Sequence, residues 1–446
     1  MSASCLRVVV MAAAVLFVSA TSSFAATIDL RAAIDSALRY NEGYRTALAE
    51  RERAEGQITS ARAGLFPQID IHGSYDRNLK LSKVVFGGEE FTIGTRYTTV
   101  GGLTIDQALF EGGGVFSAWA AARQYRSMQE HLSSQAGLDL QAEVASAYFD
   151  ALLASALVDV AQQTFDLAEK NAAVVNQKFQ QGLVSEYDEL RSRVRVANAR
   201  PPLLQARNNQ TLALLRLKNL TGLPVDTDLS LSEAESDSSA WESLPLGQLA
   251  ALAVVQRPDL AATTHQVAAI DRAIGVLKAE RWPSLRFKGS FDYQALTDAS
   301  WPGSNDFNKS WIVGLNLSYS LFDGFRRRGN IQVLKVDRKE ADLQRAQLLR
   351  LISLQIEDAR TRFAESSERL AAQEQTVDEA QRGLDIANLR YESGVGTQLE
   401  VIDAQVELST ARVYVESARH DRRVARVAWR RAMGEPILTS VPIGAK

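Results

Sequence analysis

The sequence predicts an α+β membrane protein in which one helix–strand–strand–long helix–helix unit occurs twice. Three observations lead to this fold class. Short motifs recur along the chain at a constant offset, four segments alternate between apolar and polar residues, and two long segments carry a seven-residue apolar repeat. Internal repeats are considered first, because an overlooked duplication changes the interpretation of every other segment.

The duplication is clearest in motifs that are matched in both halves. Leu109-Phe110-Glu111-Gly112 corresponds to Leu321-Phe322-Asp323-Gly324, and Gly222-x-Pro224 corresponds at the same offset to Gly434-x-Pro436. Upstream, Phe66-Pro67 matches Trp282-Pro283 at a slightly longer offset, and the difference falls in variable loops near residues 78–96 and 295–309. We therefore predict a first repeat over 26–224, a linker over 225–245, a second repeat over 246–436 and a tail over 437–446.

Residues 1–25 are predicted to be a secretory signal peptide. Arg7 precedes a short apolar run, and Ser23-Phe24-Ala25 fits a cleavage site with small residues. The apolar run is too short to span a bilayer. The one cysteine of the chain, Cys5, lies within this segment, so we expect an exported, unlipidated mature chain without disulfides or cysteine metal sites.

Charge and hydropathy exclude two classes of protein. The net charge of −3 is too mild to indicate a nucleic-acid partner. No segment after the signal is expected to form a membrane-spanning helix, because none approaches the required length of apolar sequence. If the mature chain enters a membrane, it must do so as a β-barrel, in which every backbone group is paired.

Each repeat is expected to begin with a helix, over residues 30–65 with a break near Asn41 and over 246–281 with a break at Pro258. Two alternating segments follow in each copy, and strands are predicted over about 67–81, 97–110, 283–295 and 310–322. In the third predicted strand, Leu285 and Phe287 lie on one face, and Arg286 and Lys288 lie on the other. Strands of about 10 residues suit a membrane barrel, although a soluble sheet with one buried face shows the same alternation.

The long helices carry a heptad pattern. In the second repeat, apolar residues recur every seventh position from Leu349 to Tyr391, with Ala359 and other small residues three positions further on. Small residues at the second position allow close helix approach. The helices reverse at two glycine-containing tips, 180–186 and 392–398, where Gly182 and Gly394 can adopt positive φ.

The strand number predicts an oligomer. One chain supplies four strands, which cannot close a barrel, and open strand edges are not tolerated in lipid. Three chains supply twelve, an even number as in known barrels. The same symmetry gathers the long helices into a ring, so that the tips converge at its far end.

At this point the sequence resembles the TolC-type outer-membrane efflux and secretion proteins. The resemblance covers about 28–436 and rests on the duplicated order, on both tips and on the repeated Leu-Phe-(Glu/Asp)-Gly motif. It implies a trimeric twelve-stranded β-barrel in the outer membrane, continuous with a periplasmic α-helical barrel. It also implies contacts with a periplasmic adaptor, an inner-membrane transporter and outer-membrane lipid, in multidrug efflux or type I secretion. The cargo stays open.

The resemblance further implies roles for residues at the tips. Glu400 and Asp403 match the acidic selectivity gate, and Tyr391 with Asp188 matches a hydrogen-bonded latch. An arginine in the second turn joins this latch in the family, but this chain has Gly396 there. The remaining matched positions are candidates for adaptor docking: Gly182, Leu183, Val184, Gly394 and Val395.

The sequence disfavours two other classes of protein. A periplasmic coiled-coil tether or adhesin stalk accounts for the helices but leaves the alternating strands unexplained. An enzyme is not expected, and neither are catalytic residues, cofactors or metals. The four histidines are scattered in the sequence, and Glu111-Gly112-Gly113-Gly114 lacks the lysine of a phosphate-binding loop.

Overall fold

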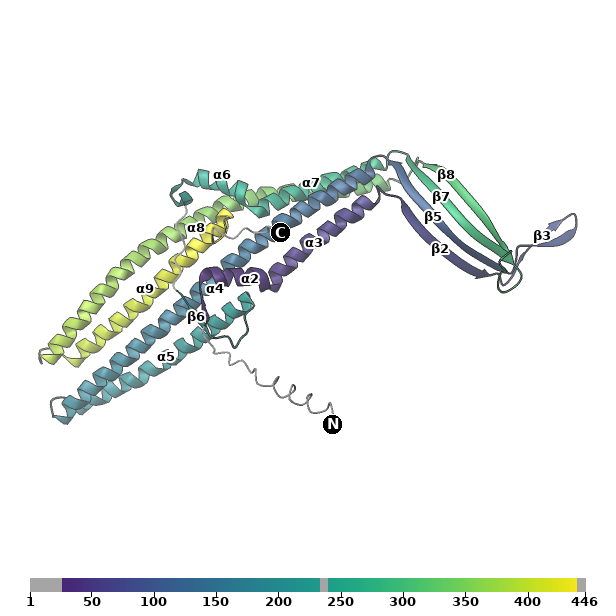
Figure 1. Ribbon diagram of the computed structural model, residues 1–446. Helices are drawn as coiled ribbons and strands as arrows, with labels where there is room; N and C mark the ends of the chain where they lie inside the picture. Colours follow the sequence, from purple (N-terminus) through teal and green to yellow (C-terminus); the bar gives the residue numbers. More distant parts are fainter. Residues whose placement is uncertain (1–25, 233–239, 439–446) are drawn as a thin grey trace, which may run out of the picture.

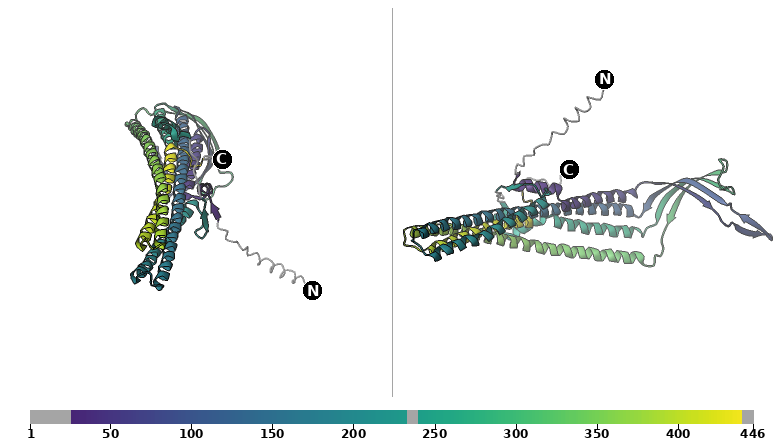
Figure 2. Two further views of the ribbon diagram at one scale, coloured as in Figure 1. Left: turned by 90° about the vertical axis from the view of Figure 1, so that its left-hand side faces the viewer. Right: turned by 90° about the horizontal axis from the view of Figure 1, so that it is seen from below.

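The computed structural model describes residues 26–232 and 240–438. Long helices run side by side and end in a curved sheet (Figure 1), and two further views show the same elongated arrangement (Figure 2). The predicted signal peptide, residues 233–239 of the predicted linker and residues 439–446 of the predicted tail lie outside the described residues.

Both repeats contain two short helices, a pair of sheet strands, a long helix and a return helix. The first runs through β1 (Ala26–Ile28), α2 (Leu30–Tyr40), α3 (Glu42–Ala63), β2 (Gln68–Arg77), β3 (Ser82–Phe86), β4 (Glu89–Ile93), β5 (Tyr97–Glu111), α4 (Gly114–Gln180) and α5 (Glu186–Thr221). After β6 (Leu229–Leu231) and η1 (Ala240–Ser243), the second runs through α6 (Leu246–Gln256), α7 (Pro258–Ala279), β7 (Ser284–Thr297), β8 (Phe307–Ser318), α8 (Arg326–Glu392) and α9 (Gln398–Met433).

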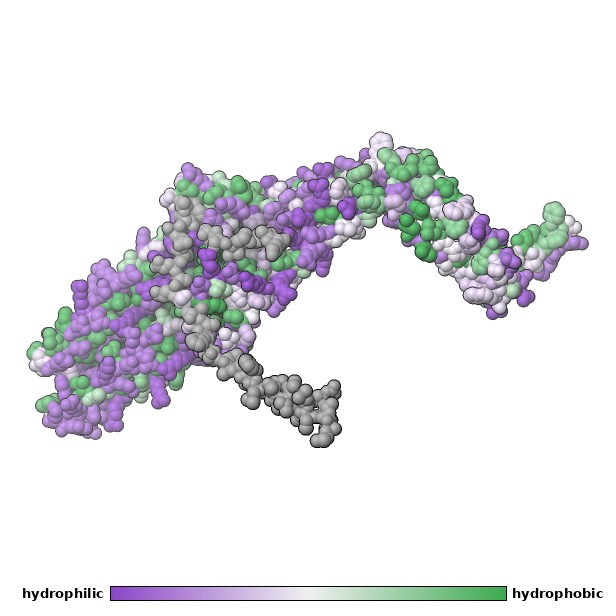
Figure 3. Space-filling model, in the orientation of Figure 1, coloured by the Kyte–Doolittle hydropathy of each residue, from purple (hydrophilic) through white to green (hydrophobic). Residues whose placement is uncertain are grey.

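Four strands form one antiparallel sheet in the order β2-β5-β7-β8, and no other strand among the described residues pairs with the outer edges of β2 and β8. Register places Ile71 beside Leu103, Leu103 beside Phe291, and Phe291 beside Trp311. One face of the sheet is therefore apolar, yet Ile71 is 85% exposed and Trp311 is 76% exposed. Figure 3 shows apolar residues gathered on the sheet, whereas polar residues cover much of the helices.

The sheet differs from the prediction in several strand bounds and in one loop. The predicted first strand extended to 81, whereas β2 ends at Arg77. Residues 78–96 were expected to be a loop, but they contain the β3–β4 hairpin, in which two strands of five residues each pair antiparallel. The predicted fourth strand extended to 322, whereas β8 ends at Ser318. Ser318 pairs with Ser284, the first residue of β7, and the preceding Pro283 has no N–H to continue the ladder.

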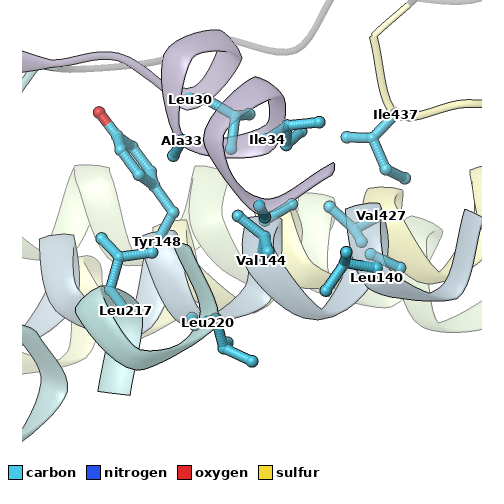
Figure 4. Close-up of a cluster of buried hydrophobic side chains, with 14 of the residues drawn as sticks. Leu30, Ala33, Ile34, Leu140, Val144, Tyr148, Leu217, Leu220, Val427 and Ile437 are labelled. Carbon is cyan, nitrogen blue, oxygen red and sulfur yellow. The ribbon is translucent and has the colours of Figure 1, made fainter. Parts of the chain in front are cut away.

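α4 and α8 each contain 67 residues, a length of about 100 Å at the usual helical rise. Heptad positions Ile356, Leu370 and Leu384 of α8 are buried, as are small residues such as Ala359. A second core joins the short helix α2 to α4, α5 and α9 (Figure 4), where Ile34 packs near Val144. These contacts fix the position of the long helices relative to one another.

The expectation that no helix is apolar enough to span a membrane is wrong for α4 on composition alone. Among the described residues, α4 contains an 18-residue window with a mean hydropathy of 1.5, of which 39% is buried. Core helices of soluble bundles meet the same criterion, and α4 supplies Tyr148, Phe149 and Ala151 to the helical core. The many alanines at packing positions of α4 raise its mean hydropathy, although the helix contains no long continuous run of apolar residues.

The two repeats meet where β5 pairs with β7, where α4 packs against α7 and where α4 packs against α9. The last of these contacts is called here the α4–α9 seam. The hydroxyls of Thr164 and Ser409 lie 2.8 Å apart across it, and Arg412 donates to Gln163.

At the tips the repeats are joined through other pairs of helices, because Lys178 of α4 donates to the Tyr391 carbonyl of α8 and Gln398 of α9 donates to the Asp188 carbonyl of α5. These contacts connect the sites predicted separately in the two halves of the chain.

Candidate functional site: the paired helix tips

The chain makes the same turn at both tips. Gly182 and Gly394 have φ of 73° and 76°, a conformation that suits glycine at the end of a helix. Leu183 N–H donates to the Lys178 carbonyl at 2.9 Å, and Val395 N–H donates to the Arg390 carbonyl at 3.0 Å. These bonds satisfy carbonyls at the ends of α4 and α8 and allow the chain to reverse.

Each return helix begins with a capping box. The Ser185 hydroxyl accepts from Asp188 N–H at 3.2 Å, and the Asp188 carboxylate accepts from Ser185 N–H at 3.3 Å. Thr397 and Glu400 make the same reciprocal pair at the start of α9. Two residues predicted to act in gating, Asp188 and Glu400, therefore also stabilise the first turn of a helix.

The two predicted gate residues differ in their surroundings. Arg390 Nε donates to Glu400 Oε2 at 3.1 Å, and this bond, with the cap from Thr397 N–H, lowers the pKa of Glu400. Asp403 lies one turn further along α9 and is exposed. Within the described part of the chain, its carboxylate has no ion pair or hydrogen bond. Asp403 is therefore the less compensated negative charge at this tip.

Gly396 is required by close packing of the backbone. A Cβ atom at this position would lie 2.8 Å from the Arg390 Cβ atom and 3.1 Å from its carbonyl carbon. Gly396 N–H also donates to the Arg390 carbonyl at 2.8 Å. A larger residue would displace this turn. The arginine of this tip, Arg390, lies on the preceding helix instead.

The predicted hydrogen bond between Tyr391 and Asp188 is not formed in this chain. The Tyr391 hydroxyl is buried without a partner among the described residues, and the Asp188 carboxylate is engaged by Ser185. Burial, followed by the negative charge of Asp188, raises the pKa of Tyr391. The two residues are thus close enough to interact electrostatically but are not bonded.

Other residues join the two tips. Lys178 Nζ lies 3.8 Å from the centre of the Tyr391 ring and 3.4 Å from the Tyr391 carbonyl oxygen. Gln398 donates to the Asp188 carbonyl oxygen at 3.5 Å. Sequence reasoning missed Lys178, although the duplication aligns it with Arg390 and so marks both tips with a cation.

The candidate docking residues lie at the ends of the tips. Leu183 is 67% exposed and Val395 is 71% exposed, while Val184 is partly buried. Gly182 and Gly394 have open space where a side chain would be. The tips therefore present a small apolar surface with little side-chain bulk around it.

The described residues contain no group of three or more histidine, cysteine, aspartate or glutamate side chains arranged to hold a metal. The histidines are nevertheless less isolated than their sequence positions indicated. The rings of His131 on α4 and His265 on α7 stack with centres 5.2 Å apart. His420 pairs with Asp150 across the α4–α9 seam.

This architecture, with paired helical tips at one end and a two-faced sheet at the other, is that of an outer-membrane channel subunit. The sequence model of the family described as "Outer membrane efflux protein" matches residues 33–223 and 249–435, one stretch in each repeat. The chain belongs to this family. It is an outer-membrane protein that extends into the periplasm and serves export.

Known proteins resemble the chain over most of its length. It is 26% identical over 383 residues to protein CyaE of Bordetella pertussis, which covers 85% of this chain and 78% of that protein. It is 25% identical over 410 residues to the solvent efflux pump outer membrane protein SrpC of Pseudomonas putida, covering 90% and 84%. The solved CmeC outer membrane channel of Campylobacter jejuni shares the fold with a TM-score of 0.78 at 19% identity, over 93% and 87% of the two chains.

Proposed function

We propose that three copies of this chain form a closed channel-tunnel that exports substrates from a periplasmic adaptor and an inner-membrane transporter to the exterior. The observation that carries the proposal is the four-stranded sheet, with an exposed apolar face and two free edges, at the end of a helical rod. The apolar face is suited to lipid, because exposed patches of this extent mark interaction surfaces. A periplasmic tether has no use for such a sheet.

The free edges support the trimer. Unpaired N–H and C=O groups on β2 and β8 are costly in lipid, so β8 of one copy is expected to pair with β2 of the next. Three copies then supply twelve strands, an even number as in bacterial barrels. Because β2 and β8 are different strands, this contact joins two different surfaces and is head-to-tail. A threefold rotation then closes the three chains into a ring.

The opposite face of the sheet is suited to a water-filled lumen. Arg286 donates to Asp106 at 2.5 Å, and His72 lies 3.2 Å from Asp292. Charged side chains on a barrel face lipid only at high cost, whereas lumen-facing positions accept them. Charged and apolar residues alternate along the same strands. A barrel with the charged face toward the lumen therefore places the apolar face toward lipid.

At the periplasmic end, Glu400 and Asp403 of three copies form the proposed selectivity gate. A ring of carboxylates in a narrow pore favours cations and repels anions. Arg390 compensates part of this charge through Glu400. Asp403, which is exposed and unpaired within the described residues, supplies the larger share of the selectivity.

Tyr391 and Asp188 are proposed to form the latch of the closed tip together with Lys178. The Lys178 ammonium lies over the Tyr391 ring and joins α4 to α8, and the negative charge of Asp188 acts on the buried Tyr391 hydroxyl. Small outward movement of either tip separates these groups. The latch therefore links closure of the gate to contact between the two repeats.

The exposed tip residues Gly182, Leu183, Val184, Gly394 and Val395 are proposed to contact the adaptor. Relatives named as efflux pump or cation efflux system proteins support a role within a pump. Their names mention different cargoes, solvents and cations, so the choice between multidrug efflux and type I secretion stays open for this chain.

The proposal is tested with the purified full chain. Native mass spectrometry should detect a trimer, and planar bilayers should show cation-selective channels whose selectivity falls in the Glu400→Ala/Asp403→Ala double variant. A monomer without channel activity contradicts the channel proposal. A conducting trimer with unchanged selectivity in the double variant contradicts only the gate assignment.

A further inference from the structure

His420 lies on α9 at the α4–α9 seam, with 17% of its side chain exposed. Its Nε2 atom is 2.8 Å from Asp150 Oδ1 on α4, and its Nδ1 atom is 3.2 Å from Asp421 Oδ1 on α9. Both ring nitrogens therefore face a carboxylate oxygen. One of these carboxylates belongs to the first repeat and the other to the second.

This geometry requires a particular protonation state. A neutral imidazole has one N–H, so its other nitrogen would direct a lone pair at a carboxylate. Only the imidazolium donates from both nitrogens. In agreement, the hydrogen bond to Asp150 raises the pKa of His420 against the opposing effect of burial, with Asp421 adding to the rise.

Charged groups from four helices surround the pair. Arg216 on α5 lies 3.7 Å from Asp150, and Arg369 on α8 lies 2.9 Å from Asp421 and 3.3 Å from Glu365. Arg423 on α9 lies over the ring of Phe149 on α4. Among these groups, histidine is the side chain whose ordinary pKa lies near neutral pH. Loss of its proton leaves Asp150 with Arg216 at 3.7 Å as its remaining cation, whereas Asp421 keeps Arg369 at 2.9 Å.

We propose that His420 is a pH-sensitive clamp between the two repeats, which holds the α4–α9 seam more tightly when it is protonated than when it is neutral. The clamp acts on α4 and α9, which also carry Lys178 and Gln398 at the tips, where these residues bond Tyr391 of α8 and Asp188 of α5. A weaker clamp therefore loosens the two helices that place these tip residues.

The duplication shows that the clamp is particular to this seam. The positions that correspond to Asp150 and His420 in the other repeat are Arg362 and Asn208. Arg362 forms an ion pair at 2.9 Å with Asp358 of its own helix. The corresponding residues therefore include no group that titrates near neutral pH, so the clamp is expected only between α4 and α9.

The direction of the pH effect follows from the raised pKa. Protonated His420 stabilises the folded seam below its unfolded pKa, and this stabilisation is lost as the pH rises through the folded pKa. This stabilisation can be measured by hydrogen exchange of the full-length protein in detergent at about pH 5.5 and about pH 8.5. The exchange rates are corrected for the intrinsic effect of pH. We expect amides of α4 and α9 around Asp150 and His420 to exchange roughly fivefold or more faster at the higher pH.

Matched variants separate the clamp from a merely structural role. His420→Gln should make exchange at the seam fast at both pH values, and His420→Arg should keep it slow at both. His131→Gln, which removes a histidine of α4 away from the seam, should retain the wild-type pH dependence. The proposal is overturned if wild-type exchange at the seam does not change with pH, or if His420→Gln retains the change. Neither readout depends on channel activity.

Discussion

Lys178 of the first repeat holds its ammonium group 3.8 Å from the ring centre of Tyr391 in the second repeat. The aromatic ring, and not the hydroxyl, makes this contact between the tips. The hydroxyl has no hydrogen-bond partner among the described residues. This arrangement distinguishes a cation–π latch from the hydrogen-bonded latch with Asp188.

Substitutions at Tyr391 separate these two forms of latch. Tyr391→Phe keeps the ring and should leave the closed-state conductance near wild type, whereas Tyr391→Leu and Lys178→Met should raise it. A partly buried cation–π contact contributes about 1 kcal/mol, or roughly a fivefold change in the opening equilibrium. Single-channel recording measures the change, with Phe179→Leu, at the corresponding position, as the control. If Tyr391→Phe opens the channel as strongly as Tyr391→Leu, the hydroxyl is the operative group.

Cation selectivity should depend more on Asp403 than on Glu400. Asp403→Asn removes an uncompensated charge, while Glu400→Gln removes one already paired with Arg390. Arg390→Gln should increase cation selectivity because it frees the Glu400 carboxylate. Reversal potentials across a salt gradient report all three variants. Equal losses in Asp403→Asn and Glu400→Gln would contradict the assignment.

Acid should disrupt the second tip only well below neutral pH. The pKa of Glu400 is lowered by Arg390 and the cap, so the stabilisation is present above its unfolded pKa and is lost as the pH falls through the folded pKa. Hydrogen exchange at the start of α9 should therefore stay slow through mildly acidic pH and rise below the ordinary glutamate range. In Arg390→Gln the rise should begin at higher pH, and an unshifted profile would exclude the ion pair as its cause.

The two N-caps should stabilise the tips to similar extents. Ser185→Ala and Thr397→Ala each remove a side-chain acceptor at a helix start, at a cost of about 1 kcal/mol. Hydrogen exchange in the first turns of α5 and α9 should accelerate roughly fivefold. Ser393→Ala is the matched control, since that hydroxyl donates to the Arg390 carbonyl and caps no helix N-terminus. Equal acceleration in the control would exclude the capping explanation.

The orientation of the sheet is testable at neighbouring residues of β8. Val313 is 70% exposed on the apolar face, and Asn316 lies on the opposite face. Val313→Arg should impair insertion into lipid vesicles by about 2–4 kcal/mol if it lies near the bilayer centre, whereas Asn316→Arg should insert normally. Folding into vesicles, followed by the heat-dependent shift in gel mobility, measures both. The reverse pattern would invert the proposed faces.

The sequence predicted the elements whose signals are local or duplicated. The heptad from Leu349 predicts burial along α8, and the repeated glycines at 182 and 394 predict both tips. Contacts between the repeats could not be predicted in this way. His420 and Asp150 are far apart in the chain, and their pairing depends on α9 lying against α4. The Arg390–Glu400 ion pair was not predicted, because the local sequence around each residue is that of an ordinary solvated helix and does not indicate a partner.

Because the unit is duplicated, every tip position exists in two chemically independent versions. Lys178 corresponds to Arg390, Asp188 to Glu400, and Val184 to Gly396. In the proposed trimer, a mutation in one repeat alters only alternate positions among the six tips, whereas six identical tips would all change at once. Duplication thus gives a lineage the freedom to adjust closure in one set of tips while conserving attachment through the other.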